Sequence, residues 1–105
     1  MPHNFELYDL RVTVTAIEGR SVCSMQVGDY FDLVESNQFR LPPGKHFCIY
    51  ALNSLMPFLA AKQRQLEAGD WLERDSLIAC PDPDERLIMK IERINKRTMD
   101  SDDLT

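Results

Sequence analysis

The sequence lacks the features that mark exported, membrane-spanning and nucleic-acid-binding proteins. Across its 105 residues no hydrophobic run approaches the roughly 20 residues that a membrane-spanning helix needs. Residues 1–20 have no uninterrupted apolar core, because Arg11, Glu18 and Arg20 break it, so we expect no signal peptide. The formal net charge is −5, and no basic patch with interleaved aromatic residues offsets it. We therefore expect neither nucleic acid nor an anionic membrane as a partner.

Cysteine is too sparse for a disulfide framework. The three cysteines are odd in number and widely spaced, so we expect free thiols and a cytoplasmic location. Structural zinc sites usually take two thiolates from one short turn, and the sequence has no such close pair. A looser candidate zinc set nevertheless exists, and zinc is the only cofactor that the sequence suggests. Its members are Cys23, His46, Cys48 and Cys80. The alternative is that Cys48 and Cys80 are small buried hydrophobic residues.

Length and composition predict one domain around one hydrophobic core. With 44% hydrophobic and 28% charged residues, the chain resembles ordinary globular proteins. Residues 7–17 alternate between apolar and polar side chains, which is typical of a strand with one buried face. That face would carry Tyr8, Leu10, Val12, Val14 and Ala16. Shorter strands are expected over 30–34, 39–41, 76–79 and 86–94, with turns between them. Trp71 is expected to begin a loop or short extended segment.

A helix should follow the turn that ends at Gly44. Apolar residues from Cys48 to Leu59 fall on one stripe of a 3.6-residue period. Pro57 interrupts this stripe, so we expect a break near Met56 and a short continuation to about Gln65. The predicted fold is α+β, with a small, mostly antiparallel sheet of four or five strands packed on one Pro-kinked helix. This domain would cover residues 1–95, and residues 96–105 would form a disordered acidic tail.

Three local patterns suggest chemistry. Cys48 lies at the predicted helix start, where the helix dipole lowers a thiol pKa, and His46 is a nearby candidate base. The turn before the helix, residues 43–46, is a weak candidate for anion binding. Acidic residues around two prolines could bind a metal or act as acid and base, although such residues more often form turns and caps. They are Asp82, Asp84 and Glu85.

Three segments together resemble a family of short, uncharacterised bacterial single-domain proteins. They are the Gly28-Asp29 turn, the stretch Phe47-Cys48-Ile49-Tyr50-Ala51-Leu52 with Leu55-Met56-Pro57, and the turn Ala79-Cys80-Pro81-Asp82-Pro83. The resemblance runs from about Tyr8 to Ile94 and implies a compact stand-alone domain without an assigned activity. Family members carry a cysteine where this chain has Ser21, with Cys23 two residues later. The positions that the resemblance transfers are Cys48, Cys80 and Asp82, together with His46.

Two functions remain open from the sequence. The first is a binding or accessory module that acts with an unidentified small molecule or protein partner, or as a homo-oligomer. The second is a small enzyme or metal-binding protein that uses a Cys/His/Asp pocket. For either function the candidate pocket residues are Cys48, Cys80, Asp82, His46, Tyr50 and Trp71.

Overall fold

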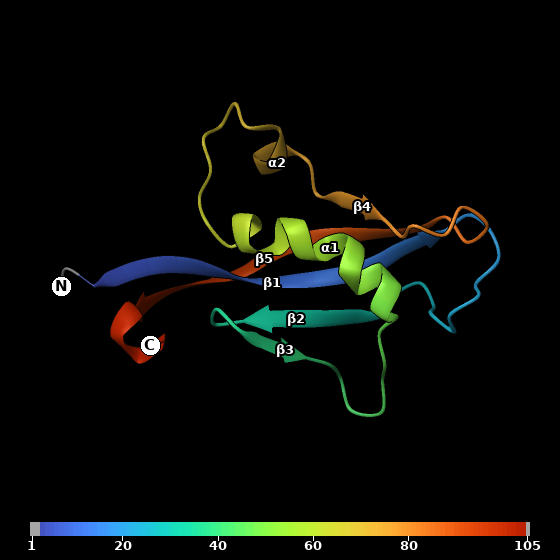
Figure 1. Ribbon diagram of the computed structural model, residues 1–105, viewed down its shortest axis with the longest axis horizontal. Coiled ribbons are helices and arrows are strands. Elements are labelled where there is room, and N and C mark those ends of the chain that lie inside the picture. The colour runs from blue at the N-terminus through green and yellow to red at the C-terminus, as the bar shows by residue number, and fades with distance from the viewer. Residues whose placement is uncertain (1–2, 105) are drawn as a thin grey trace.

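The protein is a two-layer α+β domain in which five antiparallel strands support one main helix, and this confirms the predicted fold class. The computed structural model describes residues 3–104. The strands are β1 (Asn4–Ile17), β2 (Tyr30–Val34), β3 (Gln38–Arg40), β4 (Leu77–Ala79) and β5 (Leu87–Asp100). They lie in the order β3-β2-β1-β5-β4. Helix α1 (Ile49–Lys62) crosses one face of this sheet (Figure 1).

The two long central strands form the backbone of the sheet. β1 and β5 pair from Asn4 opposite Asp100 to Ile17 opposite Leu87, with two register irregularities on the way. The sequence predicted that the last strand would end near Ile94 and that a disordered tail would follow. In the structure β5 instead continues to Asp100, and a short 3₁₀ helix η1 (Ser101–Leu104) follows it. The first residues of β1 supply the pairing partner, a long-range contact that local composition does not reveal.

The core lies between α1 and the sheet. Leu10, Val12 and Val14 of β1 are fully buried, as the alternating pattern predicted. Three residues of α1 pack on the core formed by β1, β2 and β5, and they are Ala51, Leu55 and Leu59. Burying a leucine side chain contributes about 1.5–3 kcal/mol. This layer fixes α1 on the sheet and therefore fixes the position of its N-terminus.

α1 is continuous through Pro57, so the expected break near Met56 is absent. Proline removes one backbone hydrogen bond, the one that the carbonyl of Asn53 would accept. Asn53, Met56 and Pro57 are all exposed, so this carbonyl lies on the solvent side of the helix, where water can satisfy it. The buried side of α1 meanwhile packs without interruption on the sheet.

A single helical turn, α2 (Trp71–Arg74), stands where the sequence predicted a loop or extended segment. The Asp70 carboxylate accepts a hydrogen bond from the N–H of Leu72 at 2.9 Å and caps this turn. Lys62 at the end of α1 is only 3% exposed, and its ammonium donates to the carbonyl of Leu72 at 2.8 Å. The two helices are thereby tied together beside β4. Within residues 3–104 no helix has the length and apolar character needed to cross a membrane.

Candidate functional site

Three segments that are far apart in the sequence meet at one end of the sheet. They are the loop after β1, the N-terminus of α1 and the turn between β4 and β5 (Figure 1). Gly19 brings the first and third segments together, because its N–H donates to the carbonyl of Glu85 at 2.8 Å. A Cβ atom on Gly19 would lie 1.8 Å from the carbonyl oxygen of Asp84, so only glycine fits there.

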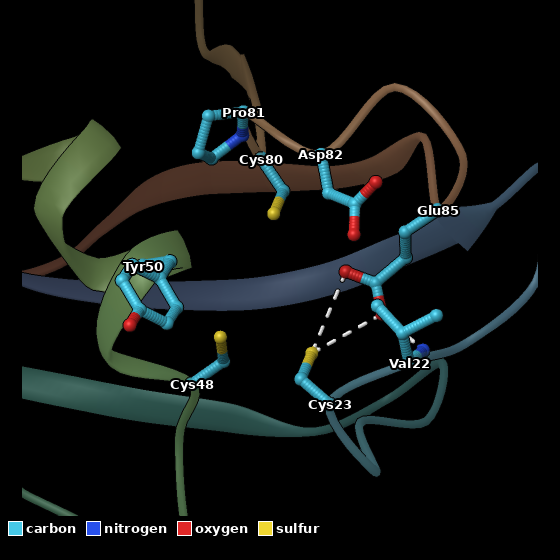
Figure 2. Close-up of a pocket in the computed structure, with 8 residues that line it drawn as sticks. All are labelled: Val22, Cys23, Cys48, Tyr50, Cys80, Pro81, Asp82 and Glu85. Atoms are coloured by element: carbon cyan, nitrogen blue, oxygen red, sulfur yellow. Dashed lines mark hydrogen bonds between the residues drawn. The ribbon is translucent and has the colours of Figure 1, made fainter.

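These segments enclose a cavity of about 400 Å³, which we call the three-cysteine pocket. Its lining is mostly apolar and comprises Val22, Cys23, Cys48, Tyr50, Cys80, Pro81, Asp82 and Glu85. Figure 2 shows the three sulfur atoms directed toward a common space, with the two carboxylates on one side. Val22 and Tyr50 are 48% and 71% exposed, so they form the mouth of the pocket. All three cysteines are free thiols.

Glu85 links two of the segments that form the pocket, because it accepts hydrogen bonds from the loop after β1. Its side chain is completely buried, yet none of the ion pairs between the described residues includes it. One carboxylate oxygen accepts a hydrogen bond from the N–H of Val22 at 2.9 Å and another from the thiol of Cys23 at 3.1 Å. Burial alone would raise the pKa of Glu85, but hydrogen bonds from Val22, Cys23 and Cys80 outweigh it and hold the pKa below its ordinary value. Glu85 is therefore a buried carboxylate that keeps its charge at neutral pH.

The same surroundings keep two of the thiols protonated. The pKa of Cys23 is raised to about 12, first by burial and further by the Glu85 carboxylate and the Cys48 thiol. Burial also raises the pKa of Cys80, with a further contribution from Glu85. Because the thiolate is the nucleophilic form, neither Cys23 nor Cys80 is set up for attack at neutral pH.

The structure brings together four of the six residues that the sequence proposed for a pocket. They are Cys48, Tyr50, Cys80 and Asp82, and Cys23 joins them. Cys48 is the N-cap of α1, and its side chain makes no capping hydrogen bond. Asp82 accepts a hydrogen bond from the N–H of Asp84 at 2.9 Å, so it shapes the turn as well as lining the cavity.

The two remaining candidates lie elsewhere. His46 places its Nε2 atom 3.4 Å from the backbone oxygen of Cys23, and no hydrogen bond joins it to Cys48 within residues 3–104. Trp71 opens α2, where it is 60% exposed and packs edge-to-face against Phe58 at a ring separation of 6.1 Å. Neither side chain lines the three-cysteine pocket.

In the glycine turn before α1 the one lysine has an acidic partner, and the weak anion site that the sequence suggested there stays a prediction. The Lys45 ammonium lies 3.7 Å from the Asp29 carboxylate, which already neutralises it. A second cavity of about 430 Å³ lies between α1 and strands β2 and β3, and its lining contains no ionisable side chain. The three-cysteine pocket is thus the cavity in which thiols and carboxylates meet.

Sequence reasoning placed Glu85 in an acidic cluster but did not include it among the pocket residues, and it overlooked Val22. The missed signal is Gly19, because a glycine directly after a long strand permits the close approach that delivers Glu85 to Val22 and Cys23. For metals, no group of three or more His, Cys, Asp or Glu side chains in the described part of the chain is arranged to hold an ion.

Comparison with protein-family models, with curated proteins and with solved structures finds no match to this chain. The resemblance to the family of short bacterial proteins therefore stays a prediction. What can be said of function rests on the geometry of the pocket.

Proposed function

We propose that this protein is a small cytoplasmic binding module that takes a small molecule into the three-cysteine pocket. One observation carries the proposal, namely that distant segments converge on a single cavity with a mostly apolar lining and two carboxylates. Its volume of about 400 Å³ falls in the range of pockets that bind small molecules. The reducing cytoplasm suits three free thiols that line a binding site.

The chemistry of the pocket favours binding over nucleophilic catalysis. A catalytic cysteine needs a thiolate and usually a base within hydrogen-bond reach. The raised pKa values of Cys23 and Cys80 oppose thiolate formation, and the ring of His46 contacts a backbone oxygen instead of a thiol. Protonated thiols are weakly polar and pack well against apolar ligands.

A variant whose pocket entrance is filled by a larger side chain tests the proposal. Val22 is 48% exposed at the pocket mouth, so Val22→Trp should fill the entrance without disturbing the core. Val27 is 62% exposed and lies outside the pocket, so Val27→Trp is the matched control. A fragment library would be screened by backbone amide shifts in nuclear magnetic resonance spectra. We expect hits that shift the amides of Cys23, Tyr50 and Asp82 in the wild type and in Val27→Trp, and that are lost in Val22→Trp. Hits that survive in Val22→Trp, or a library without hits, would contradict the proposal.

The outer face of α1 supports a second part of our proposal, namely that the protein associates with another copy of itself. Ile49 and Met56 are 69% and 57% exposed, and the one charged residue of the helix, Lys62, is buried. Solvent-facing helix surfaces normally carry charge, and exposed apolar patches mark interaction sites. We take a second copy as the partner, because an uncharged face meets its own copy without repulsion although each chain carries a net charge of −5.

Light scattering after size-exclusion chromatography tests this association. We expect a dimer for the wild type and a monomer for Met56→Glu, which places a charge on the face. Val27→Glu is the control, because Val27 is 62% exposed but lies in the loop before β2 and not on α1. A wild type that is monomeric at every concentration, or a dimer that Met56→Glu leaves intact, would exclude this interface.

Capture of a soft metal ion is the second candidate, favoured by three sulfur atoms that face one cavity beside a carboxylate (Figure 2). Zinc accepts thiolate and carboxylate ligands, and binding must displace the thiol protons. The donors would also have to move together, since they are not arranged to hold an ion in the described residues. Equilibrium dialysis decides the question: one zinc ion per wild-type chain that is lost in Cys23→Ser supports metal capture, and no bound zinc rejects it.

A further inference from the structure

We propose that the ligand of the three-cysteine pocket is a small organic cation, an ammonium group carried on a short apolar body. This inference rests on the proposed function and adds the chemical class of the ligand. It follows from the charges that line the cavity, from the one carboxylate that remains free to accept a hydrogen bond, and from the aromatic ring at the mouth.

The fixed charges around the cavity are negative. Asp82 and Glu85 line it, and its lining contains no Lys, Arg or His from the described part of the chain. Because Glu85 is in none of the ion pairs between those residues, no cation neutralises its charge. Charges act more strongly in a partly water-excluded cavity than in bulk water. An anionic ligand would be repelled, whereas a cationic ligand would be attracted.

The partial positive charge at the N-terminus of α1 opposes the negative charges of the two carboxylates, but it is smaller than they are. Cys48 caps the helix without a side-chain hydrogen bond, so the first N–H groups of α1 leave a partial positive charge near the cavity. A helix N-terminus is equivalent to roughly half an elementary charge. Two full carboxylate charges exceed it, so the cavity remains negative.

Asp82 is the carboxylate that can contact the ligand directly. Its Oδ1 atom accepts the N–H of Asp84, and none of residues 3–104 donates a hydrogen bond to its Oδ2 atom. Both Glu85 oxygens already accept hydrogen bonds, from Cys23 and Val22, and the residue is fully buried, so Glu85 acts through its charge alone. A ligand ammonium therefore pairs with Asp82, and Glu85 adds attraction from behind the cavity wall.

The mouth of the pocket suits the apolar part of such a ligand. Val22 and Pro81 provide apolar contacts, and the exposed Tyr50 provides an aromatic ring. An ammonium group near a tyrosine ring gains a cation–π attraction, which an uncharged ligand of the same shape lacks. Shape and charge together favour an arylalkyl or branched alkyl ammonium ion.

Three probes of nearly equal size test the inference: benzylammonium, benzyl alcohol and benzoate. Dissociation constants would be measured from amide shifts for the wild type, Asp82→Asn and Asp84→Asn. Asp82→Asn keeps the oxygen that accepts the N–H of Asp84, so it removes charge but preserves the turn. Asp84→Asn makes the same charge change at an exposed residue that does not line the pocket.

We expect benzylammonium to bind most tightly to the wild type. Loss of a charge-assisted hydrogen bond should weaken it about tenfold in Asp82→Asn. Asp84→Asn should match the wild type within about twofold, because exposed charges outside the pocket are screened. As an independent readout, Tyr50→Leu should weaken benzylammonium more than benzyl alcohol, because leucine is apolar but has no ring.

The possible outcomes distinguish a failure of the cation inference from a failure of the proposed binding function. If benzyl alcohol or benzoate binds as tightly as benzylammonium, or if Asp82→Asn and Asp84→Asn behave alike, the cation inference is overturned and the binding pocket stands. If none of the three probes binds near Cys23, Tyr50 and Asp82, and the fragment library also yields no hits there, both the inference and the proposed function are overturned.

Discussion

Replacement of Gly19 by alanine should collapse the end of the sheet that carries the three-cysteine pocket. The new Cβ atom would lie 1.8 Å from the carbonyl oxygen of Asp84, whereas real Cβ atoms essentially never come closer than 3.0 Å. The two backbones must therefore separate by about 1.2 Å, the difference between these distances. Both partners are backbone, so no flexible side chain can absorb the shift.

The cost follows from the hydrogen bonds that this separation breaks. Three backbone bonds join the segments, in which the N–H groups of residues 18, 19 and 20 donate to the carbonyls of residues 86, 85 and 84. At about 1 kcal/mol each, their loss should lower the free energy of unfolding by about 2–4 kcal/mol. Glu85 would also lose its position against Val22 and Cys23, so the pocket should lose its shape.

Urea denaturation followed by circular dichroism measures this change. Gly69→Ala is the matched control, because no heavy atom lies within 4 Å of its added Cβ and its φ lies outside the left-handed region. We expect Gly69→Ala to be neutral or slightly stabilising. If Gly19→Ala matched Gly69→Ala in stability, the close approach of residues 19 and 84, and with it the described pocket, would be refuted.

Three further predictions follow from the buried polar groups. The pKa values of Asp9 and Glu85 are held below their ordinary values, because hydrogen bonds to each carboxylate outweigh the effect of burial. Such groups stabilise the fold above their ordinary pKa values of 3.8 and 4.5, and this stability is lost as the pH falls. Urea midpoints should therefore drop steeply between pH 5 and about pH 3, and Glu85→Gln should flatten that drop; a flat wild-type profile would contradict it. The raised pKa of Cys23, to about 12, predicts very slow reaction with an aromatic disulfide reagent at pH 8 in the native protein and fast reaction in denaturant. Rapid native modification of Cys23, located by mass spectrometry, would count against this. Lys62→Ala should cost about 1–3 kcal/mol in urea denaturation, because it leaves the partly buried carbonyl of Leu72 without its donor. Lys96→Ala, which removes an exposed ion pair with Glu6, should have almost no effect, and equal losses in the two variants would refute the buried link.

The parts of the fold that depend on local pattern were predictable. Alternation in residues 7–17 predicted the central strand and its buried face from Leu10 to Val14, and the apolar period after Gly44 predicted α1. Before Leu10 the register irregularity at Asp9 changes the pattern, so Leu7 and Asp9 are buried and Tyr8 is only half-buried. The end of β5 was not predictable, because residues 96–100 have no apolar pattern and become a strand only through pairing with Asn4–Tyr8. Pro57 suggested a break, but the lost hydrogen bond falls on the solvent side of a helix that packing holds in place.

The candidate site shows the same division. Cys48, Cys80 and Asp82 were proposed from their positions in the sequence, and the structure places them around one cavity. The role of Glu85 was hidden, since it depends on the contact of Gly19 with a turn more than sixty residues away. His46 lies close to Cys48 in sequence, yet its ring points to the backbone of Cys23. Sequence separation of two residues did not establish a catalytic pair.

A crystal structure of the wild-type protein soaked with benzylammonium tests the central claim most directly. We expect electron density for the ligand between Val22, Tyr50 and Pro81, with its nitrogen within hydrogen-bond distance of the Asp82 carboxylate. A cavity that stays empty at saturating ligand, or a ligand bound away from the three cysteines, would contradict the account.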